Sequence, residues 1–476
     1  MATFNEKTEG MMTQNRCGHA AYRLSKREEL MSEVLTSFVN EPKFYGDTTP
    51  RMVELARELA RVDGLFVAKL ALYARTVMNM RSSSHVLCAV VAHEVKGEPY
   101  VRKAVSRCVV RGDDVTEMLA AYFALFPGEA LPNSLRRGLR DALDAMSDYT
   151  LAKYRMGGRA VTMADAVKLC HPRRREATRA LLAGELAKPT SWETELSAFG
   201  NTAEVWERLL AEDAVPYMAL LRNLRSLLKV SPANFDLALD RLSDPQAVAR
   251  SRQLPFRFWS AYKSVERSAT GKTLAALGKA LDASVANYPR LPGRTVVALD
   301  ASGSMGCRLS RKSDVRCADV AAMLAACLVR LSDDCVVYAF ADDARRMPVV
   351  AGASVLSTMS AVRFAGGCTN MRAVFEAVER DGVDCDRVVV LSDSEVNSPL
   401  CRSGKTLQGC AVALRKRLGH RVWLHAFDMA GYGTTQFAGD DTTFAAGWSD
   451  KLLSFVALSE AGLGSMADAI DALEVA

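Results

Sequence analysis

The residues best suited to chemistry lie just after an apolar run, where one carboxylate and two hydroxyls alternate with small residues. Asp300, Ser302 and Ser304 directly follow the stretch Val296 to Leu299. An apolar run with β-branched residues and no helical period is typical of a strand buried on both faces. Polar residues at the carboxyl end of such a strand lie where open α/β sheets bind ligands. Their oxygens are hard ligands of the kind that Mg²⁺ or Mn²⁺ prefers.

Two stretches further along the chain could complete such a site. Thr369 follows the glycine pair Gly366-Gly367 and precedes a helix-like run. A second apolar strand, Arg387 to Leu391, is followed by Ser392 and Asp393 and so offers a second carboxylate. The order Asp-x-Ser-x-Ser, then Thr, then Asp resembles the metal-ion-dependent adhesion site (MIDAS) of von Willebrand factor A domains. The expected ligands of the divalent cation are Asp300, Ser302, Ser304, Thr369 and Asp393.

Two residues depart from this resemblance. Cys368 stands where the pattern usually has Gly, and Ser394 stands where many A domains have Gly. If either position requires a positive φ, the substitution costs of order 1–2 kcal/mol.

Around these residues, buried strands alternate with helix-like segments, which predicts a mostly parallel, doubly wound α/β sheet. Strands are expected at 296–299, 335–340, 387–391 and 422–427, and helices at 314–331 and 405–418. Residues 441–444 are a possible edge strand, and a helix is expected from 449 to about 458. An A-like domain is therefore predicted over 294–476, after a linker at 288–293.

The preceding part of the chain has helical periodicity and no strand alternation. Its amphipathic segments are short and are separated by breaks such as Phe126-Pro127-Gly128. Short helices in such runs stack in pairs as an α-solenoid. An all-α, HEAT-like domain is therefore expected over 48–287, and residues 1–47 are expected to be an N-terminal lead-in.

The bulk properties favour a multidomain protein of the cytoplasm. A chain of 476 residues is too long for one ordinary core. It contains no apolar run of about 18 residues and does not start with a signal sequence, so no membrane association is expected. The 12 cysteines form no Cys-x-x-Cys motif, and several fall inside apolar patterns, which favours reduced thiols.

The positive charge of the chain is concentrated in one segment. Arg102 to Arg179 contains 15 Lys and Arg against 9 Asp and Glu, an excess equal to the net charge of +6 of the whole chain. A basic patch confined to one surface is the electrostatic signature of a polyanion site. A solvated helical face that is merely basic is the alternative at this point.

Stretches spread over nearly the whole length carry a wider resemblance. They are Asn40–Gly46, Leu72–Arg75, Val110–Val115, Ala152–Arg155, Pro216–Arg225, Leu254–Phe258 and Ala430–Gln436. In this order they resemble the TROVE-domain proteins, typified by the Ro autoantigen and its bacterial counterparts. In that family a ring of HEAT-like helices is joined to a von Willebrand A domain.

The resemblance implies an RNA-binding function. Small noncoding RNAs of the Y class would bind the basic outer surface of the ring, and single-stranded 3′ ends of misfolded RNAs would pass through its hole. The resemblance also implies a role in RNA quality control or decay, with an exoribonuclease such as polynucleotide phosphorylase as partner. The protomer is expected to be monomeric. The sequence leaves open which RNAs bind and whether the ring is closed.

Individual RNA-contacting residues follow from the resemblance and from the basic segment. Lys153 matches a basic position of the family, and His171 matches a nearby histidine if one residue is inserted here. A second basic position falls near Gly157, which is flanked by Arg155 and Arg159. The run Arg173, Arg174 and Arg175 is expected to open a helix and to contact phosphates.

A second group of candidates lies in the other stretches that resemble the family and is assigned to the inner surface. These residues are Arg111, Arg222, Arg225, Arg257 and Lys263. Phe258, Trp259 and Tyr262 accompany the last two and could stack unpaired bases. For two of these three aromatics we expect an ordinary place in the core.

Two other classes of function are alternatives to RNA binding. The chain could be a metal-dependent adaptor whose A domain grips an acidic partner protein while the helices act as scaffold. An enzyme is less favoured, because there is no phosphate-binding loop motif, and His93-Glu94 lacks the second histidine of a zinc protease helix. Nucleic acid that copurifies with the protein would discriminate between RNA binding and the adaptor.

Overall fold

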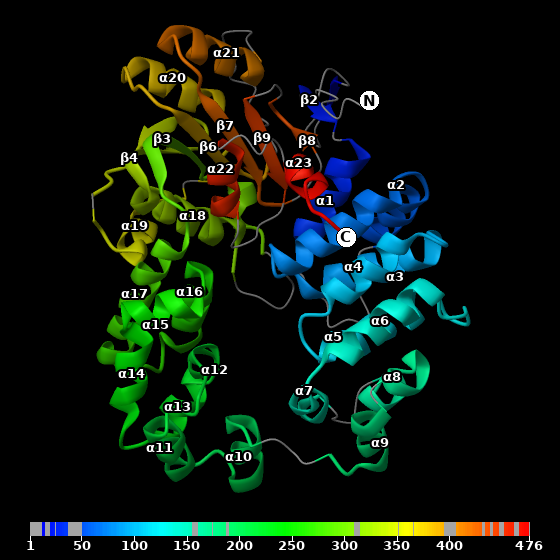
Figure 1. Cartoon of the computed structure of the whole chain (residues 1–476). Coiled ribbons are helices and arrows are strands. Elements are labelled where there is room, and N and C mark those ends of the chain that lie inside the picture. The colour runs from blue at the N-terminus through cyan, green and yellow to red at the C-terminus, as the bar shows by residue number, and fades with distance from the viewer. Residues whose placement is uncertain are drawn as a thin grey trace. The chain divides into compact units, whose positions relative to one another are not determined.

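A computed structural model of the chain (Figure 1) describes most of its residues. The described ranges are 12–14, 20–23, 25–36, 50–154, 160–173, 175–186, 190–308, 315–350, 352–364, 366–394, 406–430, 434–437, 441–446, 452–460 and 466–475. The contacts divide the chain into two compact units. The helical unit comprises Leu24–Pro189, Ala446–Lys451 and Gly462–Ala476, and the mixed unit comprises Met1–Arg23, Thr190–Ala445 and Leu452–Ala461. This division by contacts does not follow the expected domain ranges, which stay a prediction.

The helical unit is built from short helices, as its periodicity predicts. Its helices are α1 (Lys26–Thr36), α2 (Pro50–Thr76), α3 (Arg81–Glu94), α4 (Pro99–Cys108), α5 (Asp113–Leu125), α6 (Asn133–Ala145), α7 (Asp148–Lys153), α8 (Met163–Cys170), α9 (Arg175–Ala183) and α23 (Met466–Asp471). Pro50 and Pro99 stand at the first turn of their helices, where the missing N–H costs nothing. Asp63 interrupts α2 with non-helical φ and ψ, so α2 is kinked there.

The last helix, α23, packs on α2 although some 400 residues of sequence separate the two. Arg27 of α1 donates to Asp471 at 3.0 Å, and Lys69 of α2 donates to the Asp471 carbonyl oxygen. Met466 and Ile470 are buried. Residues near the end of the chain are therefore part of the helical unit rather than of the sheet.

From Thr190 onward, the described residues of the mixed unit first form eight further α-helices. They are α10 (Trp192–Phe199), α11 (Ala203–Ala211), α12 (Tyr217–Arg222), α13 (Leu224–Val230), α14 (Phe235–Ser243), α15 (Pro245–Ser251), α16 (Pro255–Val265) and α17 (Gly271–Ser284). The 3₁₀-helix η1 (Val285–Asn287) leads into the first long strand. An all-α region followed by an A domain is thus confirmed. Short helices such as α7 and α15 left no separate signal in the sequence.

The A domain of the mixed unit has a six-stranded sheet of order β5-β4-β3-β6-β7-β9. The strands are β3 (Leu291–Asp300), β4 (Ser332–Phe340), β5 (Ala344–Arg346), β6 (Arg387–Ser392), β7 (Trp423–Asp428) and β9 (Thr442–Ala446). The central strands β4, β3, β6 and β7 are parallel, with Val297 opposite both Val337 and Val389, and β5 is antiparallel to β4. β9 confirms the edge strand expected near 441–444.

Helices cover both faces of this sheet, which confirms the doubly wound prediction. Val296 and Ala298 of β3 share a core with α20 (Arg372–Arg380) and α21 (Leu407–Leu418). On the same strand Val297 and Leu299 are also fully buried, and α18 (Cys317–Leu331) packs against β3 and β4. The two remaining helices of the domain are α19 (Val355–Ala361) and α22 (Leu452–Leu458). Because both faces are covered, only the ends of the strands remain to carry a site.

A second, three-stranded sheet uses part of the expected N-terminal lead-in. β1 (Met12–Gln14) and β2 (Ala20–Arg23) are antiparallel, and β2 pairs with β8 (Thr434–Thr435), more than 400 residues further on. Strands this short leave no periodic signal in the sequence. Among the described helices, none combines the length and the apolarity needed to cross a membrane.

Candidate functional site

Three predicted metal ligands come together at the carboxyl end of β3. Asp300 ends this strand, and Ser302 and Ser304 follow at the 3₁₀-helix η2 (Gly303–Gly306). The backbone N–H of Ser302 donates to Asp300 Oδ1 at 2.9 Å, and the Ser302 and Ser304 hydroxyl oxygens lie 3.0 Å apart. The tight turn therefore gathers one carboxylate and two hydroxyls.

The neighbouring strand β6 brings a second carboxylate to the same edge. Because Leu299 is opposite Leu391 in the parallel ladder, Asp300 lies beside Ser392, whose hydroxyl donates to Asp300 Oδ2 at 2.5 Å. Asp393 follows directly, and both carboxylates are fully buried. Burial, and next the charge of Asp393, raise the pKa of Asp300 to about 7.

The loop that carries Thr369 is fastened to the turn after β3. Gly366 N donates to the Ala301 carbonyl oxygen at 3.2 Å, and Gly303 N donates to that of Gly367 at 3.4 Å. Gly367 has a φ of 95°, and a Cβ there would come within 2.5 Å of an Asp342 carboxylate oxygen. Thr369 itself is buried. The loop thus needs its glycine to pack against the strand ends.

The donor set of these five residues fits a hard divalent cation. It offers two carboxylates and three hydroxyls, all oxygen ligands, on loops held together by backbone hydrogen bonds. Within the described ranges, no group of three or more His, Cys, Asp or Glu side chains could hold a metal ion. Any cation here would thus depend on the hydroxyls as well as on Asp300 and Asp393.

A third strand end adds a residue that the sequence analysis did not propose. Asp428 closes β7, is fully buried, and accepts a hydrogen bond of 3.0 Å from Ala430 N. The signal was available, since Asp428 follows an apolar strand just as Asp300 and Asp393 do. Three neighbouring parallel strands therefore end in, or directly before, an aspartate.

Ser394 and Cys368 differ in backbone conformation. Ser394 has a φ of +59°, so the departure from glycine at this position does place an L side chain in the left-handed region. In the other loop the positive φ values belong to Gly366 and Gly367, and Cys368 adopts none. The expected strain thus applies to one of the two positions.

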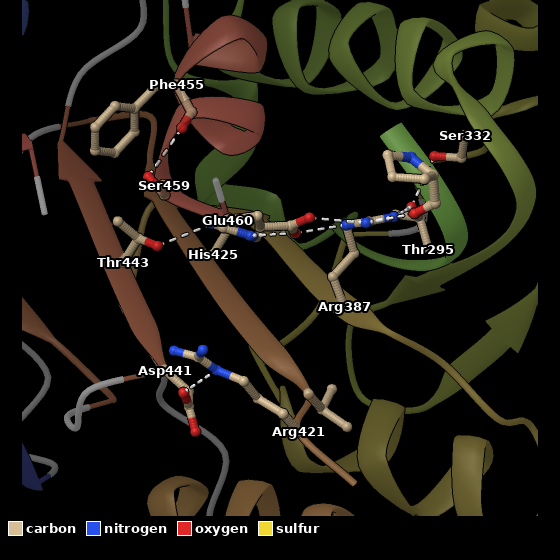
Figure 2. Close-up of polar contacts among 12 residues, drawn as sticks. Thr295, Ser332, Arg387, Arg421, His425, Asp441, Thr443, Phe455, Ser459 and Glu460 are labelled. Atoms are coloured by element: carbon tan, nitrogen blue, oxygen red, sulfur yellow. Dashed lines mark hydrogen bonds and ion pairs between the residues drawn. The ribbon is translucent and has the colours of Figure 1, made fainter. Parts of the chain in front are cut away.

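A buried polar network ties the residues after α22 to the sheet, starting from the amino end of β6 (Figure 2). Arg387, at the amino end of β6, binds Glu460 with two hydrogen bonds of 2.6 and 2.8 Å, and it also donates to Thr295 Oγ1 at 2.9 Å. His425 Nε2 lies 3.0 Å from Glu460, and its Nδ1 lies 2.9 Å from the Thr443 hydroxyl. Each group has a partner, which is typical of a structural network.

In the helical unit, Lys153 and Arg111 share one aromatic ring. Lys153 ends α7, with its Nζ 6.0 Å from the centroid of the Tyr154 ring, and the Arg111 guanidinium lies 5.7 Å from the same centroid. A Cβ on Gly112 would come within 2.5 Å of the Tyr154 ring, so glycine lets the ring pack closely. The structure thus brings two predicted RNA-contacting residues to one aromatic ring.

A buried ionic network fixes Arg111. Its backbone N–H donates to Asp114 Oδ2 at 2.7 Å, and its side chain lies 3.1 Å from Asp113. Asp114 also binds Arg75 at 2.7 Å and Arg81 at 2.5 Å. Burial alone would raise the pKa of Asp114, but His85 and the two arginines hold it well below its usual value. The buried carboxylates of Asp113 and Asp114 therefore hold the exposed Arg111 in position.

A second cluster of cations joins α6 to the segment after α8. Arg173 is exposed, and its backbone N–H donates to Asp144 at 2.6 Å. The Arg102 hydrogen bond, followed by the charges of Arg140 and Arg173, lowers the pKa of Asp141. The residues on α6 that the sequence analysis did not propose are Arg136, Arg137 and Arg140. Their signal was the spacing of three arginines over one turn of an amphipathic helix.

The other candidates of this segment are only partly described. His171 is exposed and caps the end of α8 in the left-handed conformation, with a φ of 52°. Arg155, Arg159 and Arg174 lie outside the described residues. Arg175 begins α9, as expected of a helix start, but its side chain is not among those described.

The remaining candidates lie in the mixed unit. Arg222 and Arg225 are exposed at the ends of α12 and α13, and Arg225 donates to the Ser264 carbonyl oxygen on α16 at 2.9 Å. On α16, Lys263 is exposed and bound to Glu266 at 2.8 Å, and Arg257 is half-buried. Phe258 and Trp259 are buried and Tyr262 is half-exposed, which confirms a place in the core for two of the three aromatics.

Two family models match the chain in succession. The TROVE domain matches residues 24–183 and 180–277, and these two matches span more than half of the chain. The Ro60 vWA domain matches residues 294–410, which include all five predicted metal ligands.

Individual relatives are more distant. Telomerase protein component 1 of Mus musculus and that of Rattus norvegicus are each 25% identical over 327 residues, covering 50% of this chain. The chain spans only 12% of the length of these curated relatives. The crystal structure of the Ro (RSR) protein of Deinococcus radiodurans shares the fold, with a TM-score of 0.64 and 19% identity, over 90% of this chain and 99% of that one.

Proposed function

This chain belongs to the TROVE-domain family, whose members bind RNA, and from that premise we propose that it binds small structured noncoding RNAs through its helical unit. The RNAs would be Y-like, or misfolded RNAs with single-stranded 3′ ends. The protein would act as a binding component of RNA quality control or decay, beside an exoribonuclease, and would not itself be an enzyme.

The observation that carries this proposal is the location of the charge. The whole net charge of +6 is matched by the excess of cations between Arg102 and Arg179, and this segment belongs to one compact unit. Phosphate contacts by Lys and Arg supply most of the affinity of proteins for nucleic acid without regard to sequence. A basic excess concentrated in one segment of the helical unit supports a phosphate-binding surface there.

Two local arrangements support contacts within that segment. Lys153 and Arg111 lie 6.0 and 5.7 Å from the centroid of the same Tyr154 ring. Cations beside an aromatic ring suit an RNA in which an unpaired base stacks while its phosphates are neutralised. Arg173 lies in the second cluster, whose cations outnumber the two aspartates, Asp141 and Asp144, that hold them.

A binding experiment tests the proposal. The RNA is a hairpin with a single-stranded 3′ extension, compared with the same hairpin without it, in gel shifts at several salt concentrations. The variant carries Arg137→Ala, Lys153→Ala and Arg173→Ala, since these three side chains are at least partly exposed. Because each lost phosphate contact lowers the salt slope by about 0.7–0.9, affinity should fall at least tenfold and the slope by about 2–3.

The matched control removes three exposed cations from the A domain: Arg346→Ala, Arg380→Ala and Lys416→Ala. It changes the net charge equally and should leave affinity within about twofold, as local phosphate contacts and not net charge decide binding. Equal losses in both triple variants would contradict a binding surface in the helical unit. If the first variant keeps wild-type affinity, those cations belong to a solvated helical face that does not bind RNA.

A second proposal concerns the A domain. We propose that it binds Mg²⁺, or another divalent cation such as Mn²⁺, through Asp300, Ser302, Ser304, Thr369 and Asp393. The support is the burial of two carboxylates at adjacent strand ends beside three hydroxyls. Such a cation would neutralise the carboxylates and could accept a carboxylate from an acidic partner protein, the adaptor role that the sequence left as an alternative.

A further inference from the structure

Two cysteines lie face to face next to the candidate metal site. Cys307 is exposed and directly follows η2, the turn that contains Ser304, while Cys317 is buried at the first position of α18. Their Sγ atoms form a hydrogen bond of 3.1 Å. The site is thus a dithiol with one accessible member and one protected member.

The backbone pairing around the two thiols is compatible with a disulfide. Arg308 and Arg316 form an antiparallel bridge, so Cys307 and Cys317 are the next residues directly opposite each other, and Cys317 N donates to the Cys307 carbonyl oxygen at 3.1 Å. Residues in such a hydrogen-bonded pair have Cα atoms about 5.5 Å apart, inside the range of about 4.4–6.8 Å that disulfides span. Small side-chain movements would therefore suffice to close the bond.

The two thiols differ in reactivity in the order that an exchange reaction needs. The hydrogen bond with Cys317 lowers the pKa of the Cys307 thiol to about 7, and the same hydrogen bond together with burial raises that of Cys317 well above its usual value. Since the thiolate is the attacking form, the exposed Cys307 is the first to react and Cys317 is placed to resolve the product.

Another thiol pair shows why exposure matters. Cys88 and Cys108 of the helical unit also interact through a hydrogen bond, but both are fully buried, and an oxidant cannot reach either. Cys307 and Cys317 thus differ from this pair because one of their two neighbouring thiols is exposed.

We propose that Cys307 and Cys317 are a modification site, a reversible dithiol that low-molecular-weight disulfides such as oxidised glutathione convert into an intramolecular disulfide. The Cys307 thiolate attacks one sulfur of the small disulfide, forms a mixed disulfide and releases one small thiolate. Cys317 then loses its proton and attacks the Cys307 sulfur, which releases the second small thiol. Two protein thiols are oxidised, and one small disulfide is reduced to two thiols.

The bond has a structural consequence for the A domain. The disulfide would join the turn that contains Ser304 to the first turn of α18. In the reduced protein, the Arg308–Arg316 bridge lies next to this junction. The reduced and oxidised proteins therefore differ in how firmly one hydroxyl of the candidate metal site is held. The inference needs neither RNA nor a metal to be correct.

Thiol counting on the full-length folded protein tests the site. The protein is incubated with oxidised glutathione, quenched with N-ethylmaleimide under denaturing conditions, and measured by intact mass and peptide mapping. We expect two fewer labels than in the reduced protein, a peptide cross-link between Cys307 and Cys317, and restoration of both labels by a thiol reductant. The control Cys410→Ser, which removes another partly exposed thiol of the A domain, should form the same cross-link.

Two variants separate the steps. Cys307→Ser, at an exposed position, should lose the cross-link and all fast oxidation. Cys317→Ala should stop at the mixed disulfide, seen as one glutathionyl group on Cys307. The proposal is overturned if the wild type keeps every label after treatment, if it retains glutathione on Cys307, or if the cross-link joins other cysteines.

Discussion

Asp300 and Asp393 are fully buried carboxylates at the ends of two adjacent parallel strands, and the charge of Asp393 adds to burial in raising the pKa of Asp300 to about 7. A buried carboxylate is stable as an ion only where an opposite charge or hydrogen bonds compensate for the lost water. Hydrogen bonds from Ser302 and Ser392 supply part of this compensation. A divalent cation between the two aspartates would supply the rest.

The first prediction is that Mg²⁺ stabilises the protein, and more so as the pH rises through about 7. The pKa of Asp300 is raised in the folded state from 3.8 to about 7, so without metal its contribution to stability is lost as the pH rises between these values. A cation must displace the proton, and it therefore binds better above pH 7. At about 100-fold saturation the gain in stability is about 2–3 kcal/mol.

Thermal melts in Mg²⁺ and in EDTA at pH 6 and pH 8 measure this effect. Asp300→Asn should abolish the difference between the two solutions at both pH values. Equal melting temperatures with Mg²⁺ and EDTA for the wild type at pH 8 would rule out a stabilising metal at the strand ends.

The second prediction is that RNA affinity does not depend on that metal. The basic segment Arg102–Arg179 lies in the helical unit, whereas Asp300 belongs to the mixed unit. Asp300→Ala, once shown to be folded by circular dichroism, should bind the hairpin RNA within a few-fold of wild type at each salt concentration. A loss of a hundredfold in a folded variant would mean that the A domain takes part in RNA binding.

The third prediction concerns the network of Arg387, Glu460 and His425 (Figure 2). Glu460→Ala leaves the Arg387 charge buried without its bidentate partner, and breaking a buried ion pair in this way costs about 3–5 kcal/mol. The exposed pair of Arg421 and Asp441 in the same view provides the control, because Asp441→Ala should cost about 0–1 kcal/mol. Urea unfolding of both variants gives the comparison. Similar small losses would show that the buried network contributes little.

The fourth prediction is that Ser394→Gly stabilises the A domain. An L residue at the positive φ of Ser394 costs about 1–2 kcal/mol, and glycine avoids this cost while losing part of the gain to its greater freedom when unfolded. A net gain of up to about 1 kcal/mol is expected in chemical unfolding. Cys368→Gly is the matched control, because that position has no positive φ, and it should be neutral or destabilising.

The A domain was largely predictable, because its strands are continuous apolar runs that end in polar residues. Asp300, Ser302 and Ser304 are close in sequence, and parallel pairing of β3 with β6 necessarily brings Asp393 to the same edge. The third carboxylate, Asp428, obeys the same rule and was overlooked because the family pattern does not include it. Cation binding itself is a prediction that the geometry leaves to experiment.

Long-range relationships were not predictable from one sequence. β2 pairs with β8, and the ring of Tyr154 brings Arg111 beside Lys153, across separations that no periodic pattern encodes. Short helices such as α7 and α15 were missed because six or seven residues contain too few turns to show a period.

The packing of α23 on α2 has a consequence for how the protein is made. Arg27 and Asp471 are 444 residues apart in sequence, yet they form a 3.0 Å contact inside one compact unit. During translation, α1 and α2 leave the ribosome long before α23 exists, and the surface that buries Met466 and Ile470 stays uncovered meanwhile. Nascent chains that stall within the sheet region would therefore expose the apolar surface that α23 covers in the finished protein. The helical unit can be complete only after synthesis has reached α23.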